Sequence, residues 1–80
     1  MNTYDILKKR IYDLCNEKGW TINKLATESG ISRSSLKNIL YGKSTNPGIV
    51  TIKIICDGLK ITLAQFFDTE EFNSLEQELK

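Results

Sequence analysis

The 80-residue chain contains no histidine, only one proline and two cysteines, and no apolar run near the roughly 20 residues that span a bilayer. Without histidine, the usual general base at neutral pH is missing, and no spacing of lysines or carboxylates suggests a substitute. Two cysteines cannot supply four zinc ligands. The composition therefore argues against an enzyme, a structural zinc site and a membrane-spanning segment.

The sequence also indicates the cellular compartment in which the protein is expected to act. The first ten residues, MNTYDILKKR, lack the layout of a signal peptide. We therefore expect a cytoplasmic protein with no cofactor and no small-molecule ligand. In a reducing compartment Cys15 and Cys56 should remain unpaired and act as small apolar fillers on the inner faces of helices.

Charge is distributed unevenly along the chain, although the net charge is only +1. Residues 1–43 hold eight Lys or Arg and four acids, giving +4, whereas residues 44–80 hold three and six, giving −3. No acid lies between Glu28 and Asp57. An acid-free stretch suits a polyanionic partner, although a short helical chain can contain such a gap by chance.

Three short stretches share one helix-start pattern. In each, an apolar residue precedes a hydroxyl N-cap and another apolar residue follows four positions after the cap, so the two can close as a hydrophobic staple. The caps are Thr21, Ser32 and Thr62. With further helices over about 3–18 and from residue 49, these starts predict an all-α, compact five-helix bundle.

Helical spacing also predicts which side chains fill the core. The first helix should bury Leu7, Ile11, Leu14 and Cys15, and the fourth should bury Ile49, Ile52, Ile55, Cys56 and Leu59. Trp20, Phe66 and Phe67 are expected to complete this core.

The third predicted helix, which follows the second after about four residues including Gly30, has one face that differs from the core. This short connection favours a helix-turn-helix crossing over an antiparallel hairpin. Leu36, Ile39 and Leu40 share the inner face, and Ser35 lies at its edge. The outer face carries Arg33, Ser34, Lys37, Asn38 and Tyr41. Such side chains contact bases and phosphates in duplex DNA, but an ordinary polar surface is the alternative.

The stretch WTINKLATESGISRSSLKNILYGKSTNP, followed by IICDGLKITLAQFF, resembles the phage-repressor (lambda-repressor-like) helix-turn-helix domain of the Cro/Xre family of bacterial and phage transcription regulators. The resemblance covers about residues 7–67. It implies a domain over 1–68 with its helix-turn-helix at about 21–41. It also implies a homodimer that binds double-stranded DNA at a pseudo-palindromic operator and acts as a repressor.

Carried over by position, the resemblance assigns DNA contacts to three groups of residues. Backbone contacts would come from Thr21, Ile22 and Asn23. Base edges and nearby phosphates would be met by Ser32, Arg33, Ser34, Ser35, Lys37 and Asn38. The loop that follows would contribute Tyr41, Lys43 and Ser44. Many family members have Gln at the position of Ile22, which can offer only its backbone N–H.

Residues 69–80 form an acidic amphipathic tail. Phe72, Leu75 and Leu79 recur at i, i+3 and i+7, which predicts a short helix. Because DNA would repel this tail, we expect it to pack on the domain or on a second subunit. Val50 and Ile54 could join the tail in a dimer contact, and a frayed tail is the alternative.

A protein-interaction module of the antitoxin or anti-repressor type remains the main alternative function. It would use the same fold but would bind a protein groove. Binding through several phosphates would weaken steeply with salt, whereas a protein contact usually would not.

Overall fold

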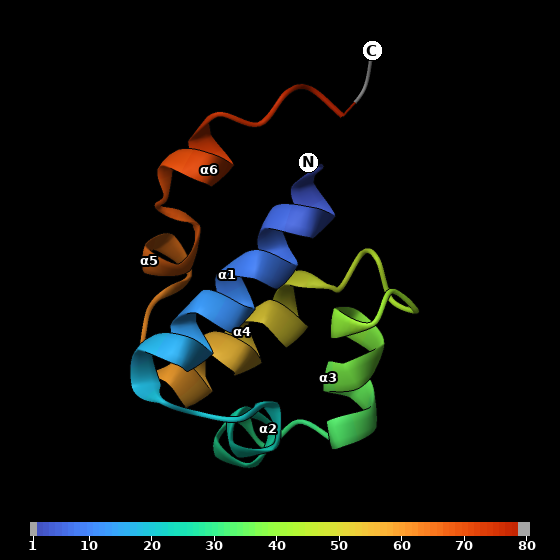
Figure 1. Cartoon of the computed structure of the whole chain (residues 1–80), viewed down its shortest axis with the longest axis vertical. Coiled ribbons are helices and arrows are strands. Elements are labelled where there is room, and N and C mark those ends of the chain that lie inside the picture. Colours follow the sequence, from blue (N-terminus) through green and yellow to red (C-terminus); the bar gives the residue numbers. More distant parts are fainter. Residues whose placement is uncertain (1, 79–80) are drawn as a thin grey trace.

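The computed structural model describes residues 2–78, which form six helices. Their bounds are α1 (Thr3–Lys18), α2 (Ile22–Ser29), α3 (Arg33–Leu40), α4 (Ile49–Leu59), α5 (Leu63–Phe67) and α6 (Glu70–Asn73). The helices α1 and α4 run through the middle of the molecule, with α2 and α3 at one end and α5 and α6 toward the other (Figure 1). The predicted all-α bundle with a helix-turn-helix is confirmed.

The helix boundaries follow local capping chemistry. Thr21, Ser32 and Thr62 each accept a backbone N–H from three residues further on, so the three predicted starts are confirmed. The Gln65 side-chain oxygen accepts in turn from the backbone N–H of Thr62, which completes a capping box. Gly30 ends α2 in the left-handed conformation, with φ 73°, and lets the chain turn directly into α3.

A single apolar core joins α1 to α5. Its buried members are Leu7, Ile11, Leu14, Cys15, Leu25, Ala26, Leu36, Ile39, Leu40, Ile52, Ile55, Cys56, Leu59 and Phe66. Both cysteines are buried and free. Trp20 and Phe67 are partly buried against this core. The predicted inner faces are therefore confirmed, with one exception on α4.

That exception is Ile49, which was expected in the core but is 59% exposed. It is the first residue of α4, where the chain has only just turned inward after Pro47. Helical spacing places Ile49 on the same side of α4 as Ile52. It cannot show that the core does not reach the first residue of the helix.

The helices α2 and α4 approach each other closely at Gly58. A Cβ placed on Gly58 would be 2.1 Å from Ser29 Oγ and 2.8 Å from Ser29 Cα. Gly58 is itself buried. The orientation of α2 against α4 therefore requires a residue without a side chain at position 58.

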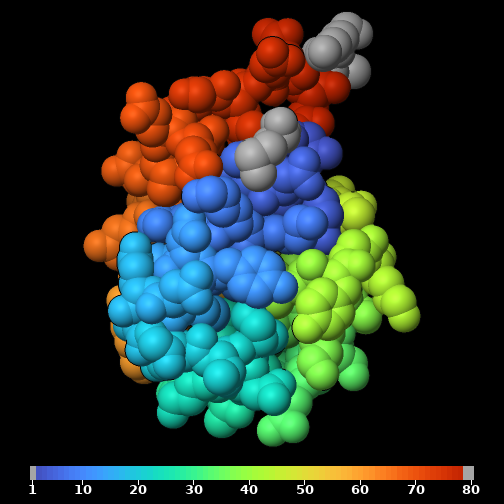
Figure 2. Space-filling view, in the orientation of Figure 1, coloured from blue at the N-terminus to red at the C-terminus, as the bar shows by residue number. Residues whose placement is uncertain are grey.

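The tail folds back on its own chain. The helix α6 is a single turn, shorter than the predicted amphipathic helix, and Leu75 lies beyond its end, half-buried. Phe72 packs against Phe67, with ring centroids 4.9 Å apart. Leu79 lies outside the described residues. In the space-filling view this C-terminal segment covers the end of the molecule away from α2 (Figure 2).

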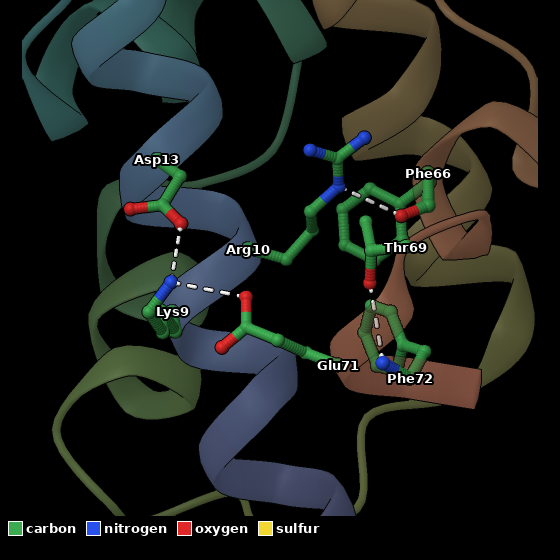
Figure 3. A network of polar contacts seen from close by, with 7 residues as sticks. All are labelled: Lys9, Arg10, Asp13, Phe66, Thr69, Glu71 and Phe72. Atoms are coloured by element: carbon green, nitrogen blue, oxygen red, sulfur yellow. Dashed lines mark hydrogen bonds and ion pairs between the residues drawn. The ribbon is translucent and has the colours of Figure 1, made fainter. Parts of the chain in front are cut away.

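Polar contacts tie both the C-terminal tail and the end of α5 to α1. Lys9 Nζ lies between Asp13, at 2.8 Å, and Glu71, at 3.1 Å (Figure 3). Arg10 donates from Nε to the Phe66 carbonyl at 2.8 Å and from Nη2 to the Gln65 carbonyl at 3.0 Å. The guanidinium thereby satisfies carbonyls at the end of α5. Among residues 2–78, no helix is long and apolar enough to span a membrane.

Candidate nucleic-acid interface

The helix α3 separates its side chains into a buried and an exposed face. Leu36, Ile39 and Leu40 are buried in the core. The outward set is exposed and consists of Arg33, Ser34, Lys37 and Asn38. It presents a guanidinium, an ammonium, an amide and a hydroxyl without any carboxylate on the helix. This face has the donors that bind base edges and phosphates.

The start of α3 is closed by two serines. The Ser32 hydroxyl oxygen accepts from the Ser35 backbone N–H at 3.1 Å, and Ser32 Oγ donates to Ser35 Oγ at 2.8 Å. Ser35 still has its own hydroxyl proton to donate. These contacts fix the first turn and leave the positive end of the helix dipole facing outward.

The three residues predicted to contact DNA at the start of α2 differ in how far their side chains are buried. Thr21 caps the helix by accepting from the Lys24 N–H at 3.1 Å, and Thr21 and Asn23 are exposed. The Ile22 side chain instead packs half-buried against the core. Because this side chain is apolar, Ile22 can offer a hydrogen bond to a ligand only from its backbone.

The connection after α3 is held by the backbone of Asn38. Its carbonyl accepts from the N–H groups of Lys43, at 3.0 Å, and Ser44, at 2.8 Å. Gly42, with φ 89°, allows the chain to turn back toward Asn38 just before Lys43. Tyr41 is the last, C-capping residue rather than part of α3, and its side chain is 66% exposed. The loop therefore presents Tyr41 and Lys43 beside the exposed end of α3.

A shallow hollow of about 260 Å³ lies between α3 and the start of α4. It brings together three predicted residues, Ser35, Asn38 and Ser44, and adds Asn46 and Thr51. Sequence reasoning did not select the last two. The polar residues on either side of the Pro47–Gly48 turn were the available signal, but only the fold shows that they face α3.

Two lysines near α2 were also missed. The ammonium groups of Lys18 and Lys24 lie over the Trp20 ring, 5.2 and 5.9 Å from its centroid. Trp20 directly precedes the cap of α2, so positive charge gathers at this helix start. The hydrogen bond from Lys24, 2.7 Å from Glu28, lowers the pKa of the Glu28 carboxyl and balances its charge.

The apolar residues predicted for a dimer contact differ in their exposure and in their contacts within the chain. Val50 is 69% exposed on α4, and Ile54, one turn further on, is half-buried. Phe72 contacts Phe66 and Phe67 of its own chain. This is the first of the two arrangements expected for the tail.

The fold and this surface define a small domain whose helix-turn-helix is made by α2 and α3 (Figure 1). Its α3 helix presents a polar face without an acidic residue. The model of the Cro/C1-type helix-turn-helix DNA-binding domain matches residues 10–71. The chain therefore belongs to this family, and its expected resemblance to Cro/Xre proteins is confirmed.

Similar proteins include a curated transcription regulator and a prophage protein of known structure. Over 53 residues it is 43% identical to the HTH-type transcriptional regulator SlrR of Bacillus subtilis (strain 168), a match that covers 66% of this chain and 35% of that protein. The chain thus spans about a third of this relative. The crystal structure of the prophage Lp1 protein 11 superimposes with a TM-score of 0.80 at 30% identity, covering 94% of this chain and all of that one.

Proposed function

We propose that this domain is a sequence-specific regulator of transcription, of the repressor type, that binds duplex DNA as a dimer. The observation that carries the proposal is the exposed face of α3, where Arg33, Lys37 and Asn38 project from a helix with no acid. The name of the SlrR relative, a transcriptional regulator, supports the regulatory part of the proposal.

In this proposal backbone contacts set the position of the domain on DNA. The N–H groups at the start of α2, with Thr21 and Asn23 beside them, bind phosphates of one strand. Tyr41, Lys43 and Ser44 bind phosphates beyond the other end of α3. Ser35 donates its remaining hydroxyl proton to a phosphate at the helix start, while the Ser32 hydroxyl holds the Ser35 side chain in place. These contacts carry no sequence information, but they hold α3 in the major groove.

Base readout then falls to the outward side chains of α3. Arg33 and Lys37 have the donors that guanine O6 and N7 accept, and Asn38 can form a paired hydrogen bond with adenine. Ser34 is short and can donate to several bases. Each paired contact contributes about 1–3 kcal/mol of discrimination against a wrong base.

Dimerisation is proposed on the side of α4 that carries exposed apolar residues. Ile49 and Val50 are adjacent and strongly exposed. Beside them, a groove of about 670 Å³ is lined by Pro47, Ile52 and Phe72, among others. In this proposal Val50 of a second copy inserts into the groove, and Ile54 and Leu75 are further apolar residues available to the contact. A pair of identical domains would match a pseudo-palindromic operator.

Selection of bound duplexes from a random pool tests the proposal. We expect an enriched site with two related half-sites, and log K for that site should fall steeply with log salt. If no sequence is enriched and salt has little effect on capture, DNA binding is refuted and the protein-interaction alternative is favoured.

A further inference from the structure

The first turn of α1 is joined to the last turn of α3 by a side chain. The Tyr4 hydroxyl donates a hydrogen bond to the backbone carbonyl of Ile39, thirty-five residues away in sequence. This contact is partly buried, and Tyr4 is half-buried. It is a direct link between the N-terminal helix and the helix proposed to read DNA.

The Ile39 carbonyl is one that helix geometry leaves without a partner. The last four carbonyls of a helix have no N–H within the helix to accept from. At the end of α3 the Lys37 carbonyl accepts from the Tyr41 N–H, and the Asn38 carbonyl accepts from the loop that follows. Tyr4 supplies the donor for the next carbonyl, that of Ile39. It therefore fixes the end of α3 immediately beside the exposed side chain of Asn38.

The position of Tyr4 is itself well determined. Asn2 and Asp5 form a capping box around the first turn of α1. The Glu78 carboxylate accepts from the Thr3 N–H at 3.0 Å and from the Thr3 hydroxyl at 2.6 Å. The Lys8 ammonium lies 4.8 Å from the centroid of the Tyr4 ring. Because these contacts hold the first turn of α1 and the Tyr4 ring, the Tyr4 hydroxyl can keep the end of α3 in a fixed position.

We propose that Tyr4 is a positioning residue for sequence recognition, which holds the end of α3 in the orientation that base contacts require. This inference rests on the proposed function of α3. Tyr4 itself touches no base in this account. It acts by keeping the competent orientation of α3 dominant in the free protein, and a ligand's apparent affinity scales with that population.

The size of the effect is limited by one hydrogen bond. Losing a neutral hydrogen bond to a partly buried carbonyl changes an equilibrium by about two- to tenfold. Base-edge contacts need an accurate helix orientation, whereas contacts to phosphates along the strand tolerate small shifts. Loss of the Tyr4 hydroxyl should therefore weaken specific binding more than non-specific binding.

The test compares Tyr4→Phe with Tyr12→Phe in the full chain. Both changes remove a phenol hydroxyl from α1 and keep the ring, but the Tyr12 side chain is 37% exposed. Binding is measured to the duplex selected by the parent protein and to a scrambled duplex of equal length. The temperature is one at which circular dichroism shows all three proteins to be folded.

We expect Tyr4→Phe to bind the selected duplex about two- to tenfold more weakly, with little change on the scrambled duplex. Tyr12→Phe should match the parent on both. Equal losses on both duplexes, or no loss on either, would overturn the inference. Failure of the parent to prefer its selected duplex would instead count against the proposed function, so the two failures are distinguishable.

Discussion

Gly58 of α4 lies directly against Ser29 of α2, so closely that a methyl group at position 58 would overlap both the hydroxyl and the Cα of Ser29. The helix α2 is also the first helix of the helix-turn-helix. It ends at Ser29, and its C-cap is Gly30. The contact therefore fixes where the turn leaves the core and, through it, the direction of α3.

Gly58→Ala should destabilise the protein by about 1–3 kcal/mol or more, because the clash involves the Ser29 backbone and not only a movable side chain. Gly48→Ala is the matched control, since a Cβ there has no atom within 4 Å and Gly48 has a negative φ of −66°. The free energy of unfolding is measured in urea. If the two variants had equal free energies of unfolding, the close contact between α2 and α4 at Gly58 would not contribute to stability.

Lys60→Gly should stabilise the protein by up to about 1 kcal/mol. Lys60 ends α4 with φ 62°, a left-handed conformation that is unfavourable for a residue with a Cβ. The gain is reduced by the larger entropy that glycine adds to the unfolded chain. Thermal unfolding reports the change. Gly30→Ala, at φ 73°, provides the opposite control and should be destabilised by a similar amount.

Arg10→Met should lower the free energy of unfolding by about 1.5–3 kcal/mol, the range for hydrogen bonds that involve a charged group. The methionine keeps much of the aliphatic stem but leaves two carbonyls at the end of α5 without their donor. Figure 3 shows one of them, the Phe66 carbonyl beside the Arg10 guanidinium. Urea denaturation measures the loss. Lys9→Met is the control: it removes only exposed ion pairs, which contribute little, so its loss should be clearly smaller than that of Arg10→Met. An equal loss in both variants would contradict the role given to the guanidinium.

Truncation after Asp68 should reduce stability and separate the two roles proposed for the tail. It removes Phe72 from its contacts with Phe66 and Phe67. Sedimentation at micromolar concentration then compares the truncated and full chains. A dimer lost on truncation would support a tail contribution to the interface. An unchanged dimer, or a full chain that is monomeric, would end that idea.

Most of the fold was predictable because its determinants are local. The caps at Thr21, Ser32 and Thr62 depend on residues within one turn, so the sequence shows them directly. The outward direction of Arg33 and Lys37 follows from the spacing of Leu36 and Ile39 around a helix.

What the sequence did not reveal depends on contacts between distant segments. Gly58 looks like an unfavourable residue inside a helix until Ser29 is seen to lie against it. The bond from Tyr4 to Ile39 links two helices whose relative placement no spacing predicts. Thr51 joined the hollow beside α3 for the same reason.

The central claim is that the exposed face of α3 reads DNA, and affinity for the selected duplex tests it most directly. Arg33→Ala and Lys37→Ala are compared with Lys53→Ala, which removes an exposed lysine of α4 that is paired with Asp57. The account predicts a loss of about 1–3 kcal/mol for a variant that loses a guanine contact, with relaxed specificity at that base pair, and little change for Lys53→Ala. Binding as tight as the parent's by both α3 variants would contradict it.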